Sequence, residues 1–195
     1  MFDLHAETSE LNKRAAEIAR AAADKHSTSD KPRYVLGSMG PGTKLITLGQ
    51  IDWDAMRASY AQAMRGLIAG GADAIMIETC QDLLQVKCAI NAAIAALDES
   101  GKTPDDIPIM VSVTIEQTGA MLLGTSIEGA LSALRGYPIA SLGLNCATGP
   151  TEMTEHIHHL SKHWDKHVTV LPNAGLPVLV DGKTEYPLQP QAFAE

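Results

Sequence analysis

Apolar residues recur along the chain with two spacings, and the two alternate. Spacings of three and four residues predict helices, whereas short continuous or alternating apolar runs predict strands. Helices are expected at 10–25, 54–69, 82–97, 127–135 and 151–164, and strands at 33–37, 72–78, 109–115, 140–146 and 168–171. A turn at 187–190 and a helix starting at Gln191 are expected after the last strand.

The first predicted helix has one apolar face and a polar residue ahead of it. Ser9 suits the N-cap position, because its hydroxyl can accept a hydrogen bond from a free N–H of the first turn. We expect this helix to pack on the fold through its apolar face. The face is expected to comprise Leu11, Ala15, Ile18, Ala19 and Ala22.

Five strands that alternate with helices indicate βαβ units and one parallel sheet, either wrapped into a barrel or doubly wound. The strand at 109–115 favours a barrel, because Ser112 and Thr114 alternate with apolar neighbours and could face a ligand inside it. A closed barrel takes about 250 residues and eight strands. We therefore expect an α/β fold, an incomplete (β/α)8 TIM barrel with about five of eight parallel strands. The alternative is a complete five-stranded doubly wound fold.

Length, charge and cysteine content narrow the class of protein. The 195 residues are 45% hydrophobic, enough for the core of one domain. A formal net charge of -8 disfavours nucleic-acid and anionic-membrane surfaces, so a small molecule is the expected partner. Three cysteines, an odd number, favour a reducing setting. With neither a signal peptide nor an apolar stretch of about 18 residues in the sequence, we expect a soluble cytoplasmic protein.

Polar segments follow the predicted strands at their carboxyl ends, where parallel α/β folds bind ligands. These segments are 37–44, 78–80, 116–118, 145–146 and 173–175. The first is rich in glycine, but Thr43-Lys44 reverses the order of a phosphate loop, and no helix is expected until after Ile51. A tight turn that needs glycine is therefore preferred to a phosphate site.

Two residues at strand ends are candidates for chemistry. Glu78 ends an apolar strand, where an ionised carboxylate needs a cation or a hydrogen-bond donor, but it could equally cap the next helix together with Thr79 and Asp82. Cys146 follows a strand and precedes a helix-starting proline, a place that favours a thiolate able to bind a metal or attack an electrophile. A buried, inert cysteine is an equal alternative. One cysteine alone does not make a zinc site, which needs three or four ligands.

The remaining thiols and the histidines are weaker candidates. Cys88 lies in the middle of a predicted helix and is expected in the core, and Cys80 is also less favoured than Cys146. Five histidines fall in 156–167, and His159 with His163 has the spacing of helical metal sites. The histidines cannot all share one helix face, so a solvated surface is the preferred interpretation.

Several segments of the chain, taken together, resemble one family. They are 31–35, 40–41, 70–79, 143–147, 172–175 and 186–188. The combination closely resembles the homocysteine-binding barrel, or homocysteine S-methyltransferase domain, of cobalamin-dependent methionine synthase over essentially the whole chain. Betaine- and S-methylmethionine-dependent homocysteine methyltransferases share much of the pattern.

The resemblance implies roles for three residues. In that family three cysteine thiolates hold a zinc ion, and Cys146 matches the first of them. Glu78 matches the acidic residue that receives the homocysteine ammonium, and Asn173 matches an asparagine beside the metal. The family's Gly-Gly-Cys-Cys-Gly segment has no counterpart in this sequence. We therefore expect residues 1–195 to form a partial homocysteine S-methyltransferase barrel without its first two strands and its eighth.

The resemblance also implies a reaction and its cofactors. Zinc would hold homocysteine as a thiolate, which accepts a methyl group from methylcobalamin, and ultimately from methyltetrahydrofolate, to give methionine. Cobalamin-binding and folate-binding modules would be the protein partners. We expect this chain alone to be inactive. The alternatives are an inactive remnant that associates through its sheet edges, a subunit completed by a partner, or an unrelated doubly wound enzyme with Cys146 as nucleophile.

Overall fold

The computed structural model describes residues 4–175 and 177–194, and each predicted strand and helix is present in it. The helices are η1 (His5–Glu7), α1 (Thr8–His26), α2 (Trp53–Ala69), α3 (Leu83–Glu99), α4 (Ile127–Leu134), α5 (Pro150–His163) and α6 (Pro190–Ala194). The strands are β1 (Leu36–Met39), β2 (Ala74–Cys80), β3 (Ile109–Val113), β4 (Ile139–Asn145), β5 (His167–Leu171), β6 (Val178–Val180) and β7 (Lys183–Glu185). No helix in the described part of the chain has the length and apolar character to cross a membrane.

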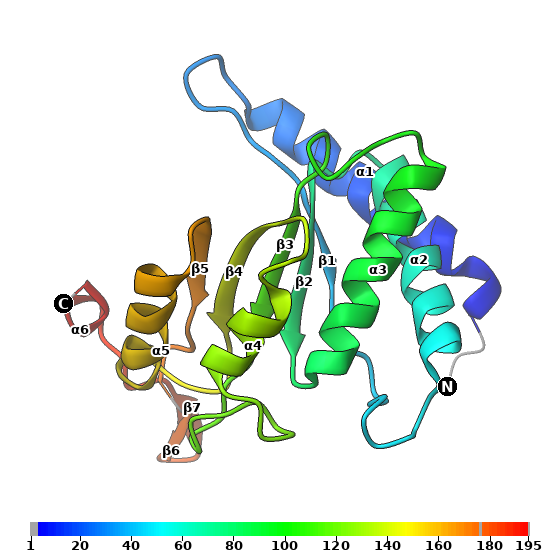
Figure 1. The fold of residues 1–195 in the computed structure, drawn as a ribbon. Coiled ribbons are helices and arrows are strands. Elements are labelled where there is room, and N and C mark those ends of the chain that lie inside the picture. Colours follow the sequence, from blue (N-terminus) through cyan, green and yellow to red (C-terminus); the bar gives the residue numbers. More distant parts are fainter. Residues whose placement is uncertain (1–3, 176, 195) are drawn as a thin grey trace.

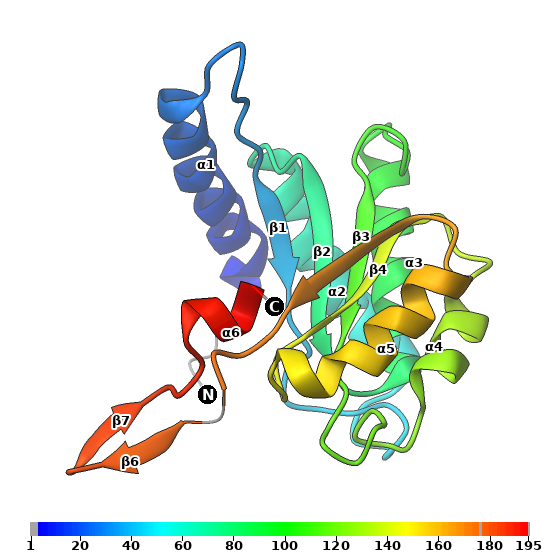
Figure 2. The same cartoon turned by 90° about the vertical axis from the view of Figure 1, so that its left-hand side faces the viewer.

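Strands β1 to β5 form one parallel sheet in chain order, β1-β2-β3-β4-β5. In a doubly wound sheet the order departs from the chain order at a switch point, and helices cover both faces. Here the order is sequential, and α1 to α5 lie on the outer side of the curved sheet (Figures 1 and 2). This is the arrangement of a (β/α)8 barrel. The prediction of a partial barrel is confirmed, and the doubly wound alternative is wrong.

The hydrophobic core lies between the sheet and its helices. Its largest fully buried side chains are Met64, Ile75, Ile77, Ile90, Leu97, Ile109, Met121, Ile127, Leu134, Ile139, Leu142 and Leu144. The two faces of β1 differ: Gly37 and Met39 are buried, whereas Leu36 and Ser38 on the opposite face are exposed. In a barrel that opposite face points to the interior, where ligand-binding groups project.

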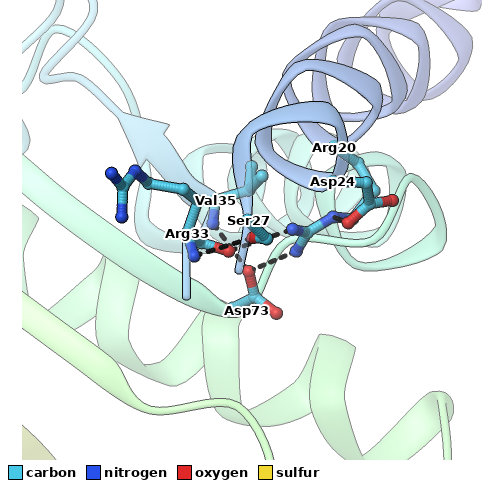
Figure 3. Close-up of polar contacts among 6 residues, drawn as sticks. All are labelled: Arg20, Asp24, Ser27, Arg33, Val35 and Asp73. Carbon is cyan, nitrogen blue, oxygen red and sulfur yellow. Dashed lines mark hydrogen bonds and ion pairs between the residues drawn. The ribbon is translucent and has the colours of Figure 1, made fainter. Parts of the chain in front are cut away.

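Strand β1 begins at Leu36, three residues later than predicted, and side chains at the amino end of the sheet explain the difference (Figure 3). The backbone N–H of Arg33 donates to Oγ of Ser27 at 2.9 Å. The backbone N–H of Val35 donates to Oδ2 of Asp73 at 2.6 Å. These N–H groups are occupied by side chains, so the segment that looks β-prone in sequence joins the sheet only from Leu36.

Arg20 extends this cluster and ties α1 to the start of two strands. Its Nη1 lies 2.6 Å from Oδ2 of Asp73, just before β2, and its Nη2 donates to the carbonyl of Arg33 at 3.0 Å (Figure 3). Asp24, one turn further along α1, forms a second ion pair with Arg20 at 2.8 Å. The cluster therefore fixes α1, β1 and β2 relative to one another at the amino end of the sheet.

A strand pair that the sequence analysis missed follows β5. Strands β6 and β7 pair antiparallel, and the two residues between them, Asp181 and Gly182, have φ of 49° and 77°. Positive φ at both central positions is the mark of a type I′ turn, for which Asp-Gly is a preferred pair. The dipeptide between two short β-prone runs was therefore an available signal. The hairpin projects from the barrel, and Leu179 near its tip is 77% exposed (Figure 2).

Helix α1 packs through a different face from the one expected. Ser9 lies inside the helix, and the N-cap is Glu7 without a side-chain hydrogen bond, so the prediction of Ser9 as N-cap is wrong. The whole expected apolar face is exposed, including Leu11 at 53% and Ile18 at 62%. Among the described residues of α1, Ala16 alone is buried.

Gly66 in α2 and Gly70, the C-cap of that helix, explain this choice of face. A Cβ at Gly66 would lie 2.2 Å from the backbone oxygen of Ser9, and one at Gly70 would lie 2.3 Å from that of Lys13. Real Cβ atoms do not approach an oxygen so closely, so only glycine lets the two helix backbones meet here. The contact depends on the shape of α2, and the apolar pattern of α1 therefore gave the wrong face.

Replacing Gly66 with alanine should push α1 away from α2, because the added methyl group has no space. We expect the clash to lower the free energy of unfolding by about 1–3 kcal/mol. The higher helix propensity of alanine should offset a few tenths to about 1 kcal/mol of this loss. Urea denaturation followed by circular dichroism measures the change. Gly136→Ala is the matched control, because nothing lies within 4 Å of a Cβ there. A Gly66→Ala variant as stable as this control would contradict the close contact.

Candidate functional site

Glu78, Cys146 and Asn173 lie at one edge of the sheet. Glu78 is in β2, Cys146 directly follows β4, and Asn173 follows β5 by two residues. Because these strands are parallel, their carboxyl ends meet at this edge. The segments beyond β4 and β5 also stay paired, since the N–H of Cys146 donates to the carbonyl of Leu171 and that of Asn173 to the carbonyl of Thr148, both at 3.1 Å.

Glu78 projects from β2 toward the neighbouring strand β1. Its side chain is half-buried, and Oε1 accepts a hydrogen bond from Oγ of Ser38 at 2.5 Å. Within residues 4–175 and 177–194, no ion pair involves Glu78. Of the residues in the capping alternative, Asp82 is the N-cap of α3, and its side chain accepts from the N–H of Leu84 at 2.9 Å. Glu78 itself bonds Ser38 on β1 and does not cap the helix.

Cys146 stands where the chain turns sharply away from β4. Its φ is 59° and that of Ala147 is 56°, two successive left-handed residues without a glycine. The thiol is half-buried, and its sulfur accepts a hydrogen bond from Nδ2 of Asn145 at 3.1 Å. The alternative of a buried cysteine is therefore wrong, since the sulfur lies at the open edge and contacts a polar group.

Asn145 is a residue of this site that the sequence analysis left without a role. It ends β4, is buried, and contacts both the thiol of Cys146 and the segment after Glu78. Ser141, Gly143 and Asn145 alternate along β4, so the small polar residues ahead of Asn145 were a signal that it faces inward.

Cys80 and Cys88 are both buried in the core, which was expected for Cys88. Burial raises the pKa of the Cys80 thiol to about 12, with the charges of Asp82 and Glu78 adding to the effect. Burial also raises the pKa of the Cys88 thiol to about 11, and its sulfur lies 3.5 Å from the carbonyl oxygen of Trp53. Both thiols therefore stay protonated at neutral pH and are unsuited to bind a metal or act as nucleophiles.

The glycine-rich segment 37–44 forms the connection after β1 and lacks the form of a phosphate loop. Helix α2 begins only at Trp53, and its N-cap is Asp52, whose carboxylate accepts from the N–H of Ala55 at 2.8 Å. The carbonyl of Pro41 accepts from the hydroxyl of Tyr60 at 3.0 Å, which holds the segment against α2. The preferred interpretation, a turn, agrees with these contacts.

Asn173 borders a cavity of about 300 Å³ between the segment after β5 and α6. Pro172, Leu188 and Phe193 also line it. Its link to the Cys146 segment is the backbone hydrogen bond to Thr148. Asn173 therefore lies at the carboxyl edge of the sheet, beside the segment that follows Cys146.

Side chains that can bind a metal do not gather into a site in the part of the chain that the structure describes. No three His, Cys, Asp or Glu side chains there are grouped so that they could hold a metal ion. The rings of His159 and His163 lie 4.4 Å apart between centroids, tilted by 37°, on α5 at the outer side of the sheet. Since a zinc site needs three or four protein ligands, these residues do not form one by themselves.

The family model for homocysteine S-methyltransferase matches residues 1–195. The chain belongs to this family. It is 50% identical over 194 residues to a methionine synthase of Mycobacterium leprae (strain TN) and 48% identical over 194 residues to one of Mycobacterium tuberculosis (strain ATCC 25618 / H37Rv). Each alignment covers 100% of this chain, and the chain spans 16% of the length of these relatives.

Two solved structures of a homocysteine methyltransferase have a similar fold. The apo form of the homocysteine methyltransferase MmuM from Escherichia coli matches 88% of this chain and 62% of its own, with a TM-score of 0.71 at 23% identity. Its oxidised form matches 87% of this chain and 59% of its own, with a TM-score of 0.69 at 22% identity. At this identity the likeness supports the fold, and it agrees with the partial barrel.

Alkylation should distinguish the three thiols of the folded chain. At pH 8 we expect iodoacetamide to modify Cys146 at least about 100-fold faster than Cys80 or Cys88, because those two are buried and, with raised pKa values, remain protonated. Peptide mass spectrometry measures the modification at each site. In urea all three should react at similar rates. Modification of Cys80 in the folded chain as fast as that of Cys146 would refute this assignment.

Proposed function

We propose that this chain provides part of the homocysteine site of a methionine synthase. Glu78 would bind the ammonium group of homocysteine, Cys146 would be one thiolate ligand of zinc, and Asn173 would lie beside the metal. The observation that carries the proposal is a carboxylate and a half-buried thiol at one sheet edge in a member of the homocysteine S-methyltransferase family. The methyl acceptor is then the sulfur of homocysteine, and the product is methionine.

The surroundings of Glu78 support a role in binding an ammonium group. The hydroxyl of Ser38 orients Oε1, and a carboxylate can accept about four hydrogen bonds, so capacity remains for a cationic donor. A half-buried carboxylate gains most from a partner that is itself charged. The α-ammonium of an amino acid meets this requirement.

The proposed zinc centre needs ligands in addition to Cys146. The sequence has three cysteines, and the other two are buried in the core. We propose that the remaining thiolates come from outside these residues, together with strands that pair with β1 and β5, the two edge strands of the sheet. Zinc, when bound, lowers the pKa of a sulfur ligand and so supplies a thiolate at neutral pH.

The wider reaction is proposed from the relatives. We propose methylcobalamin as the methyl donor, with cobalamin-binding and folate-binding modules as partners, because the chain resembles the barrel of cobalamin-dependent methionine synthase and is 48–50% identical to two methionine synthases. This favours the cobalamin-dependent reaction over the betaine- and S-methylmethionine-dependent ones. A cytoplasmic location is part of the same proposal.

Glu78→Gln should weaken binding of L-homocysteine by about 10-fold or more, because a neutral amide loses the charge-assisted hydrogen bond to the ammonium. Titration followed by NMR or calorimetry measures the affinity. Glu116→Gln is the matched control: it removes one charge from the half-buried carboxylate that follows β3 at the same edge. An equal loss in both variants, or none in Glu78→Gln, would count against the assigned role.

This chain alone should lose zinc on dialysis against a chelator, because one thiolate does not replace three protein ligands. It should likewise form no methionine from homocysteine and methylcobalamin. Elemental analysis and product chromatography measure the two properties. The proposal of an incomplete centre is wrong if the chain retains stoichiometric zinc and its Cys146→Ser variant does not.

A further inference from the structure

One buried side chain contacts both strand ends that carry the candidate residues. Asn145 is 3% exposed, and its Oδ1 accepts from the backbone N–H of Thr79 at 3.0 Å and from Oγ of Ser112 at 2.7 Å. Its Nδ2 donates to Oγ1 of Thr79 at 2.7 Å and to Sγ of Cys146 at 3.1 Å. These four hydrogen bonds use both acceptor positions and both N–H groups of the amide.

The orientation of the Asn145 amide follows from its partners. A backbone N–H can only donate, so the oxygen of the Asn145 amide has to face the backbone N–H of Thr79. A flipped amide would bring two donors together. The N–H groups therefore point toward the hydroxyl of Thr79 and the sulfur of Cys146.

The backbone at both of these strand ends is strained. Thr79 and Cys146 each have φ of 59°. A left-handed conformation is unfavourable for a residue other than glycine, and it is least favourable for a β-branched residue such as threonine. Residues keep this backbone conformation where hydrogen bonds and packing around them stabilise it. At Thr79 the two hydrogen bonds with Asn145, one donated by the Thr79 N–H and one accepted by its hydroxyl, stabilise this conformation.

The amide links two strands that do not pair with each other. Strand β3 lies between β2 and β4 in the sheet. Asn145, at the end of β4, bonds Ser112 on β3 and reaches Thr79 on β2. The segment with Glu78 and the thiol of Cys146 are therefore fixed relative to each other by one side chain in addition to the sheet.

We propose that Asn145 is a positioning residue that sets the distance between the carboxylate of Glu78 and the sulfur of Cys146. The inference rests on the proposed function, in which these groups lie at the ammonium and sulfur ends of homocysteine. Three carbons separate the two ends of that amino acid, so a site that recognises both ends needs its groups at a fixed separation. Asn145 acts through Thr79 and Cys146 and does not itself take part in the chemistry.

NMR of the labelled chain tests the positioning. Asn145→Ala should move the backbone chemical shifts of both Thr79 and Cys146 toward those of extended backbone. It should also speed amide hydrogen exchange at Thr79 at least about 10-fold. Ser112→Ala, which removes one hydrogen bond to the same Oδ1, should leave both sets of signals in place. Unchanged left-handed signals at both residues in folded Asn145→Ala overturn the proposal.

Asn145→Asp keeps the test decisive if the alanine variant does not fold. A carboxylate retains an acceptor for the N–H of Thr79 and for Ser112, but it has no N–H for the sulfur. The signals of Cys146 should therefore move, while the amide of Thr79 stays protected. Unchanged signals at Cys146 in this variant overturn the proposal.

Titration with L-homocysteine separates positioning from folding. The Asn145 variants should bind it at least about 10-fold more weakly than the wild type, and Ser112→Ala within about 2-fold. Wild-type affinity in the folded Asn145 variants overturns the proposal even if their signals move. If the wild type itself does not bind L-homocysteine, the proposed function fails, and the NMR result alone decides whether Asn145 positions the two strand ends.

Discussion

Consecutive parallel strands have to start at the same end of a sheet, and this requirement arranges the rest of the molecule. Each strand returns through a helix on the outer side, so all carboxyl ends face one way. The two ends of the sheet consequently differ. At the amino end, Asp73 and Arg20 bind the starts of β1 and β2 to α1. At the carboxyl end, Asn145 bonds the two strained residues, Thr79 and Cys146, next to Glu78.

The sequence was sufficient for the features that depend on local periodicity and on burial. Alternating apolar spacings gave the helices and strands, and the small polar residues Ser112 and Thr114 favoured the barrel because such side chains can face its interior. Cys88 was placed in the core from its position in an apolar helix. Glu78 and Cys146 were found because strand ends are where parallel folds bind ligands.

Features that depend on contacts between distant segments could not be predicted in the same way. The packed face of α1 follows from Gly66 in α2 and Gly70 at its C-cap, and no property of the α1 pattern indicates it. The late start of β1 depends on Asp73, which is 38 residues beyond Val35. The role of Asn145 likewise requires Thr79 and becomes visible only when β2, β3 and β4 lie side by side. The β6–β7 hairpin is different, because its Asp-Gly signal was local and was overlooked.

The unequal exposure of the three sulfurs has a practical consequence. Those of Cys80 and Cys88 are buried in the core, and that of Cys146 lies at the sheet edge where the ligand is proposed to bind. The native chain thus carries a natural attachment point for a fluorophore or a spin label, with no need to engineer cysteines in or out. A label there would sense changes in mobility and polarity at this edge as further strands or ligands come to cover it.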